Sequence, residues 1–316
     1  MMIAGYIVAG MLLGAPAEEP VVSADFVALF DACEYRHTGG QYQDELFRYR
    51  LFLPRNLRPT ERCPLLVWLP GKGEDGSDNE KNLKWLNQVL DDSAHIEKYR
   101  FFILAVQCPS GSPWSKHPDS EDDMVAVSHA IFQKTIKEQP IDLDRVYLSG
   151  VSAGSSAVWE MALRYPSLFA AVVPMASGGS DPSRASRLAR IPIWAFHNRE
   201  DSGCSSAGDE EMVAALLKAG GNVRLTLGWK FYGDAPEFSA GHDCWSMAMK
   251  YDRIMDWMLA QRRGAWICWT PPGHKPWKWW HVFGVPSAFL AIVLLAWFSE
   301  RRPKGTETGP GPIKRG

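Results

Sequence analysis

Short apolar runs alternate with longer amphipathic stretches through the middle of the chain. The apolar runs are rich in β-branched and aromatic residues, which is typical of strands, and cover residues 47–53, 65–69, 101–106, 146–149, 170–175, 193–196 and 223–227. The amphipathic stretches predict helices over residues 82–98, 122–137, 155–165, 206–219 and 245–261. Strands that alternate with helices indicate an α/β fold with a mostly parallel central sheet covered by helices on both faces.

The N-terminal residues depart from this pattern. Residues 1–17 are almost wholly apolar and close on Ala15-Pro16-Ala17, which fits the apolar region and small-residue cleavage site of a signal peptide. A basic stretch before the apolar run is missing. An uncleaved anchor and a misplaced start codon therefore stay open beside the predicted signal peptide.

A second apolar segment lies near the C-terminus, at residues 279–298, and its length matches a membrane-spanning helix. Its two ends carry the aromatic residues Trp277, Trp279, Trp280 and Trp297. The basic residues that follow it, Arg301, Arg302 and Lys304, predict a cytoplasmic tail over residues 299–316. A buried core helix is one alternative. Another is a sorting signal that is removed after export and leaves a soluble protein.

These segments define a predicted domain order. An α/β domain over residues 18–262 follows the signal peptide, and a linker rich in proline and tryptophan, residues 263–278, joins it to the membrane helix. The protein is then exported and anchored, with its domain on the extracytoplasmic side. The net charge of −2 over 316 residues includes no long basic stripe, which argues against nucleic acid as a partner.

Six cysteines could form up to three disulfides in an oxidising compartment. Cys204 lies close to Asp201 and Cys244 lies close to His242, so a bridge between the two cysteines could brace the loops that carry these residues. Free buried thiols are the alternative.

The sequence Gly150-Val151-Ser152-Ala153-Gly154 follows a predicted strand and precedes a predicted helix. This is the context of a nucleophile elbow, a strained turn that exposes a serine and needs small residues on both sides. The N–H group of Ala153 would lie at the start of the following helix, where it can stabilise negative charge. One donor of an oxyanion hole is therefore predicted.

Five landmarks in one order give the chain a family resemblance. They are residues 69–76, Gln107-Cys108-Pro109, the elbow with Trp159-Glu160-Met161, residues 197–201, and Gly241-His242-Asp243-Cys244-Trp245. Over residues 45–262 the chain resembles the α/β-hydrolase superfamily. More narrowly, it resembles exported esterases grouped with polyhydroxybutyrate depolymerases, feruloyl and acetylxylan esterases, and phospholipase/carboxylesterases.

A serine needs a histidine base, and that histidine needs a carboxylate to fix its tautomer. The resemblance places the acid at Asp201 and the base at His242, in the superfamily order of serine, acid and histidine. Glu200 competes with Asp201 as the acid, and Asp243 lies next to the base. The expected catalytic residues are therefore Ser152, Asp201 and His242.

The second oxyanion donor is implied by the resemblance to be the backbone N–H of Lys72. Pro70 stands where related enzymes commonly have histidine, and Glu74-Asp75-Gly76 replaces a frequent Glu-Arg-Gly, so the loop departs from the family pattern. Trp114 and Trp245 are candidates for lining a substrate pocket, with core packing as the alternative.

The sequence thus predicts a serine hydrolase that cleaves carboxylic esters through an acyl-enzyme, with a small-molecule or polymeric ester as substrate. A peptidase of prolyl oligopeptidase type and an inactive surface-binding protein on the same fold are the alternatives. No cofactor is expected, because Gly71-Lys72-Gly73 lacks the rest of a phosphate-binding fingerprint. No metal site is expected either, since the histidines lack metal-ligand spacing.

Overall fold

A computed structural model of the chain describes residues 22–90, 100–228, 241–250 and 254–265. All of them belong to one compact unit, Met1–His274. The predicted signal peptide, membrane helix and tail lie outside the described residues, as does most of the predicted linker. Within the described ranges, no helix combines the length and apolar character needed to cross a bilayer.

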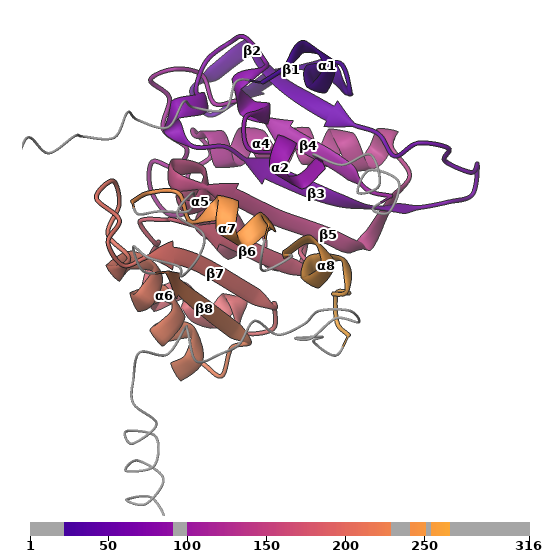
Figure 1. Ribbon diagram of the computed structural model, residues 1–316. Coiled ribbons are helices and arrows are strands. Elements are labelled where there is room, and N and C mark those ends of the chain that lie inside the picture. Colours follow the sequence, from indigo (N-terminus) through magenta and orange to yellow (C-terminus); the bar gives the residue numbers. More distant parts are fainter. Residues whose placement is uncertain (1–21, 91–99, 229–240, 251–253, 266–316) are drawn as a thin grey trace, which may run out of the picture. The chain divides into compact units, whose positions relative to one another are not determined.

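One eight-stranded sheet forms the centre of the unit, in the order β1-β2-β4-β3-β5-β6-β7-β8 (Figure 1). From β4 onwards in that order, neighbouring strands are parallel, which confirms the prediction of a mostly parallel sheet. The strands are β1 (Phe30–Gly39), β2 (Tyr42–Phe52), β3 (Cys63–Leu69), β4 (Phe102–Val106), β5 (Ile141–Val151), β6 (Ala171–Met175), β7 (Ile193–Asn198) and β8 (Val223–Gly228).

The edge strand β1 is absent from the sequence prediction. It pairs with β2 in an antiparallel hairpin, and β2 in turn runs antiparallel to β4. Only alternate residues of β1, such as Cys33 and Tyr35, turn toward the core, while the residues between them are exposed. Few of its residues are strongly apolar, so the strand lacks the continuous apolar run that marks the buried strands.

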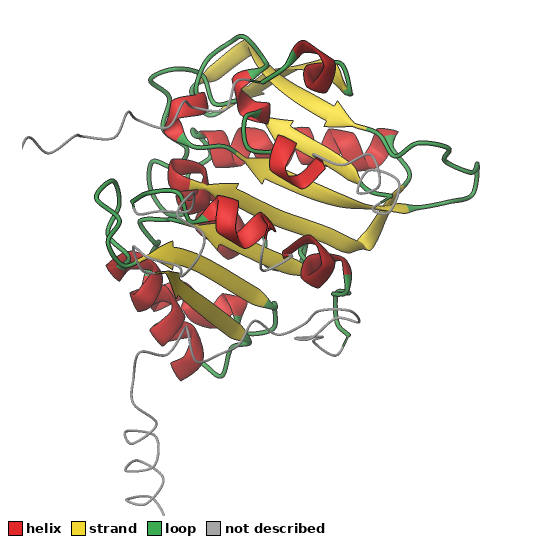
Figure 2. Ribbon diagram, in the orientation of Figure 1, coloured by secondary structure: helices red, strands yellow, loops and turns green. Residues whose placement is uncertain are grey.

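Helices cover both faces of the sheet, as predicted (Figure 2). The helices of the described residues are α1 (Ala24–Val27), α2 (Asn87–Leu90), α4 (Met124–Glu138), α5 (Ser152–Arg164), α6 (Ala207–Lys218), α7 (Trp245–Lys250) and α8 (Ile254–Leu259). Three short 3-10 helices, η1 (Lys72–Glu74), η2 (Lys81–Leu83) and η3 (Pro182–Leu188), lie in the connections. Within 245–261, where one helix was predicted, the described residues form α7 and α8, and α5 begins at Ser152 rather than at residue 155.

The strands separate two hydrophobic core layers. Alternate residues of β3 point to opposite layers: Leu65 and Val67 lie in one, Leu66 and Trp68 in the other. The first layer contains side chains of α4, α5, α6 and η3, and the second contains side chains of α2, α7 and α8. Because both faces are covered, the polar loops at the ends of the strands are left to form a site.

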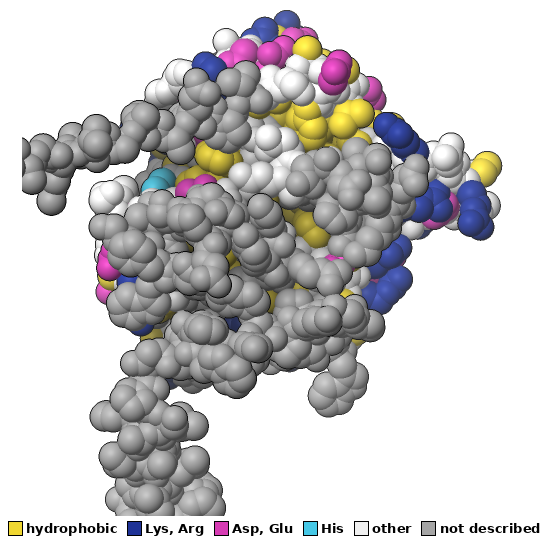
Figure 3. Space-filling model, in the orientation of Figure 1, with side chains coloured by type: hydrophobic (Ala, Val, Ile, Leu, Met, Phe, Trp, Pro, Cys, Tyr) yellow, Lys and Arg dark blue, Asp and Glu magenta, His cyan; other side chains and the backbone are white. Residues whose placement is uncertain are grey.

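The surface of the unit carries separate groups of basic and acidic side chains. The loop between β2 and β3 carries the exposed residues Arg55, Arg58 and Arg62. Basic side chains gather at the right of the view in Figure 3. Acidic side chains gather elsewhere on the same face. The surface therefore mixes both signs of charge, in keeping with the small net charge.

Candidate active site

Ser152 occupies a strained turn between β5 and α5. Its φ of 54° lies in the left-handed region, which is costly for a residue with a side chain. The flanking glycines have no room for a Cβ: one added at Gly150 would lie 2.3 Å from the Leu69 carbonyl oxygen, and one at Gly154 would lie 2.2 Å from that same oxygen. The small residues of the elbow are thus required by close packing against the end of β3.

The same packing brings the predicted oxyanion loop beside the serine. A Cβ at Gly71 would lie 3.2 Å from the Cβ of Ser152. Lys72 begins η1 and Ala153 lies in the first turn of α5, and neither helix has a side-chain cap at its N-terminus. Backbone N–H groups in a first turn have no partner inside their own helix, so both can point at an anion.

Gln107, at the end of β4, ties the oxyanion loop to the sheet. Its side-chain amide donates to the Glu74 carbonyl at 3.3 Å and to the Asp78 carboxylate at 3.0 Å, and its oxygen accepts from the backbone of Asn79 at 2.6 Å. Gln107 is buried, so these bonds are protected from water. The sequence landmark at residues 107–109 therefore supports the loop that carries Lys72.

Three residues from separate loops form a hydrogen-bonded series. Nε2 of His242 lies 2.7 Å from Oγ of Ser152, and Nδ1 of the same ring lies 2.7 Å from Oδ2 of Asp201. The side chain of Asn198, at the end of β7, donates to the carbonyls of Gly241 and Asp243, on either side of His242. The carboxyl ends of β5 and β7 thus bring the three predicted residues together.

The two competing carboxylates stand elsewhere. Glu200 is exposed, whereas the side chain of Asp201 has no exposed area. Asp243 accepts from the backbone N–H and the hydroxyl of Ser246, at 2.9 and 2.6 Å. Its carboxylate therefore caps the first turn of α7, and no hydrogen bond joins it to His242.

Asp201 is held as a carboxylate. Burial alone would raise its pKa, but the hydrogen bond from His242 and those from the backbone N–H groups of Cys204 and Gly203 hold the pKa below its usual value. The backbone bonds reach Oδ1, at 2.7 Å from Gly203 and 2.9 Å from Cys204. Oδ2 is left to face His242, which is the geometry that fixes a histidine tautomer.

The two candidate pocket tryptophans lie in different layers. Trp245 packs edge-on against the ring of His242 at 5.4 Å and against Trp85 at 5.1 Å, and Trp85 donates to the Glu74 carboxylate at 3.2 Å. Trp114 is 6% exposed and belongs to the other core layer, among side chains of α4 and α5. Both side chains are buried in a core layer, and of the two Trp245 also contacts the ring of His242.

A second buried histidine adjoins the site and was given no role by the sequence analysis. His197, in β7, lies 2.7 Å from Asp209 through Nδ1 and 3.2 Å from Asp201 through Nε2. The side chains of all three have no exposed area. A sequence signal for this cluster does exist: His197 directly follows an apolar run that predicts a buried strand, and Asp201 and Asp209 come after it.

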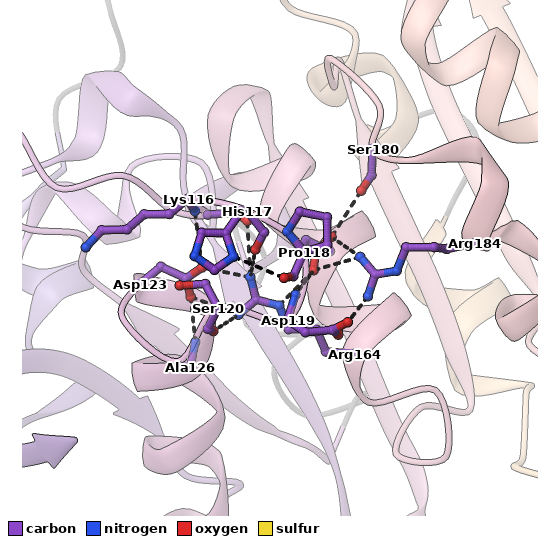
Figure 4. Close-up of polar contacts among 12 residues, drawn as sticks. Lys116, His117, Pro118, Asp119, Ser120, Asp123, Ala126, Arg164, Ser180 and Arg184 are labelled. Carbon is purple, nitrogen blue, oxygen red and sulfur yellow. Dashed lines mark hydrogen bonds and ion pairs between the residues drawn. The ribbon is translucent and has the colours of Figure 1, made fainter. Parts of the chain in front are cut away.

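The far end of α5 is anchored by another buried cluster. Arg164, in the last turn, pairs with Asp123 at 2.7 Å and with Glu160 at 2.7 Å, and it donates to the carbonyl of His117 (Figure 4). Arg184 approaches the same Glu160 at 3.0 Å. These bonds clamp the segment before α4 against α5, the helix that begins with Ser152.

The five cysteines within the described residues are free thiols, so the suggested Cys204–Cys244 bridge is not present. The thiol of Cys244 instead contacts the Phe196 carbonyl, at 3.4 Å. Among the described residues, no group of histidine, cysteine and carboxylate side chains is arranged to hold a metal ion. The sixth cysteine, Cys268, lies outside the described residues.

Comparison with known proteins places this site in a family context. Residues 47–202 match the family model of esterase PHB depolymerase. A bifunctional acetylxylan esterase/xylanase, XynS20E, of Neocallimastix patriciarum is 28% identical over 170 residues, which cover 53% of this chain and 23% of that protein. The resemblance drawn from the sequence landmarks is thereby confirmed.

Solved structures agree with this. The crystal structure of a thermostable esterase is 30% identical, with a TM-score of 0.68, and the match covers 75% of this chain and 64% of that one. An acylaminoacyl peptidase of Pyrococcus horikoshii has a TM-score of 0.55 at 14% identity and shares the fold alone. The chain spans less than two thirds of these relatives' own length. The family, the relative and the esterase structure together support a carboxylic ester hydrolase.

Proposed function

Residues 47–202 match the family model of esterase PHB depolymerase, and from this premise we propose that the protein is a serine esterase of the α/β-hydrolase type acting through Ser152, His242 and Asp201. The observation that carries the proposal is the pair of 2.7 Å hydrogen bonds that links the serine, the histidine and the buried aspartate. A serine at neutral pH becomes a competent nucleophile only with such a base.

The proposed reaction has two halves. Oγ of Ser152 attacks the ester carbonyl carbon while its proton passes to Nε2 of His242, and the resulting oxyanion accepts from the N–H groups of Ala153 and Lys72. His242 then returns the proton to the departing alkoxide, so an alcohol leaves and an acyl-enzyme remains. In the second half, His242 takes a proton from water while the water oxygen attacks the acyl carbon. The bond from that carbon to Oγ of Ser152 then breaks, His242 returns the proton to Oγ, and the carboxylic acid leaves.

The departures from the family pattern in the oxyanion loop are compatible with this chemistry. Pro70 lacks a backbone N–H, but the proposed donor belongs to Lys72, two residues later. Gly71 separates them and packs against Ser152. The loop thus keeps a backbone donor near the serine without the histidine that relatives often have.

Probe labelling tests the proposal directly. The full-length protein is expected to react with a fluorophosphonate probe and to hydrolyse p-nitrophenyl acetate, with acetylated xylan as a second substrate. Ser152→Ala and His242→Ala should lose both reactions, whereas Ser183→Ala, at an exposed serine of η3, should keep them. Folded wild-type protein that neither labels nor hydrolyses would overturn the proposal and favour the surface-binding alternative.

We also propose that the enzyme is exported and held on a membrane by residues 279–298. The apolar length of this segment, its tryptophan-rich ends and the basic residues after it support the proposal. The full-length protein should stay with membranes after carbonate extraction, and a chain ending at residue 278 should not. Release of the full-length protein by carbonate would contradict the anchor.

A further inference from the structure

His197 is fully buried, and each of its ring nitrogens faces only acceptors among the described residues. Nδ1 lies 2.7 Å from the Asp209 carboxylate. Nε2 lies 3.1 Å from the carbonyl oxygen of Cys204 and 3.2 Å from Oδ2 of Asp201. A neutral imidazole has one N–H and one lone pair, so either tautomer would direct a lone pair at an oxygen that also bears lone pairs. Only the doubly protonated ring satisfies both sides.

Asp209, in α6, is surrounded by donors in the same way. Its Oδ1 accepts from Nε1 of Trp159 at 2.7 Å and from the hydroxyl of Ser177 at 2.7 Å, and its Oδ2 accepts from the Ser177 backbone at 3.1 Å. The Ser177 hydroxyl in turn accepts from the N–H of Gly179, so its own proton is available for Asp209. The carboxylate is therefore built into the fold as a counter-ion for His197.

The charge balance of the cluster favours the cation. Two buried carboxylates with a neutral histidine would leave two negative charges inside the protein, whereas an imidazolium leaves one. Burial by itself would lower the pKa of His197, but the hydrogen bond and charge of Asp209, the Cys204 carbonyl and the charge of Asp201 raise it. The remaining negative charge is available to the imidazolium that forms on His242 during the proposed reaction.

Other titratable groups around His197 do not compete for this role. They are the carboxylates of Asp201 and Asp209, the imidazole of His242 and carboxyl of Asp243 beyond Asp201, and the thiols of Cys204 and Cys244. Burial raises the pKa of both thiols, which keeps them neutral.

We propose that His197 is a positioning residue of the site: a buried imidazolium that holds Asp201 in place and, through its positive charge, limits how basic Asp201 makes His242. The inference rests on the proposed function for its catalytic consequence, but the protonation of His197 stands on the geometry alone. Asp201 then has two partners on one oxygen, His242 at 2.7 Å and His197 at 3.2 Å.

Nitrogen-15 NMR of the full-length protein, labelled at histidine and assigned with single variants, tests the protonation. His197 should show both ring nitrogens protonated throughout the pH range in which His242 titrates. A neutral His197 at pH about 7, the middle of the range where histidines ordinarily titrate, would overturn the proposal. This readout needs neither a variant at His197 that folds nor an active enzyme.

The variant His197→Gln tests the effect on the base. With the positive charge gone, the pKa of His242 should rise by about one unit, read from its NMR titration. If the esterase proposal holds, the acid limb of kcat/KM should move to higher pH by the same amount, and kcat should fall about 10- to 100-fold from misplacement of Asp201. A role in packing alone would lower kcat without moving either titration.

A matched control separates these outcomes from general destabilisation. His129→Gln changes a histidine of α4 that stacks on Tyr165 at 3.7 Å, away from the hydrogen-bonded series, and should leave the titration of His242 unchanged. Inactive wild-type protein whose His197 is doubly protonated would sink the esterase proposal and support this one. Active wild-type protein together with an unchanged His242 titration in His197→Gln would support the esterase proposal and overturn the role proposed for His197.

Discussion

Two regions of the molecule place a buried cation between two carboxylates, and they differ in what the cation can do. Arg164 lies between Asp123 and Glu160 at the end of α5, and His197 lies between Asp201 and Asp209 beside the proposed active site. Both cations are almost inaccessible to water. The arginine cluster joins α5, which carries Arg164 and Glu160, to Asp123 at the start of α4, whereas the histidine cluster joins β7 to the following loop and α6.

The difference lies in the acid strength of the cation. Burial disfavours the charge on Arg164, but its hydrogen bonds to Asp123 and Glu160 outweigh this and raise its pKa, so the guanidinium stays charged at every relevant pH. A histidine can lose its proton within the range in which proteins remain folded. The arginine cluster therefore acts as a fixed clamp, whereas the histidine cluster couples protonation to the site.

We expect the largest effect from a substitution in the histidine cluster, at Asp201. Asp201→Asn should reduce kcat about 10⁴-fold, because the amide no longer holds His242 in the required tautomer. Oδ1 keeps its backbone donors in this variant, so the fold should persist. Steady-state hydrolysis of p-nitrophenyl acetate, with circular dichroism to confirm folding, measures this. Activity comparable to the wild type would exclude Asp201 as the acid.

A substitution in the arginine cluster should lower stability and leave turnover largely unchanged. Arg164→Met leaves Asp123 without its buried counter-ion and should lower the free energy of unfolding by about 3–5 kcal/mol. The protein that remains folded should keep most of its turnover. Urea unfolding beside active-site titration measures both quantities. The more exposed Arg187→Met is the control and should change stability by about 0.5 kcal/mol or less. A stable but inactive Arg164→Met would contradict the clamp.

The pH dependence of stability sharpens the comparison. Since the pKa of His197 is raised in the folded state, its contribution is fully present below pH about 6.5, the unfolded value, and is lost as the pH rises through the folded pKa. Wild type should therefore lose stability relative to His197→Gln over this window, by up to about 1.4 kcal/mol per pH unit. Urea unfolding at a series of pH values tests this. A constant difference between the two proteins would refute it.

The smallest effect concerns the outer partner of the clamp. Arg184 pairs with Glu160 and with Asp119, but Asp119 is largely exposed. Because Glu160 keeps Arg164, Arg184→Gln should cost about 1 kcal/mol or less in unfolding free energy and leave kcat unchanged. A loss as large as that of Arg164→Met would show that the two arginines act as one unit.

The local patterns of the sequence were sufficient for much of the fold. The buried strands appear as continuous apolar runs, and the elbow is readable because Gly150 and Gly154 are demanded by contacts that leave no room for a Cβ. The edge strand β1 could not be predicted in this way. Its alternate residues are exposed, and what makes it a strand is its pairing with β2.

The order of the candidate serine, acid and histidine can be read from the sequence alone, because short motifs at predicted strand ends carry those residues. The tertiary structure adds that Asp201, and not the exposed Glu200, bonds to His242, that Trp114 is buried, that Cys204 and Cys244 are free thiols, and that His197 contacts Asp209. The physical reason is that burial and hydrogen bonding depend on neighbours from distant parts of the chain. A histidine surrounded by acceptors cannot be recognised until the fold has assembled them.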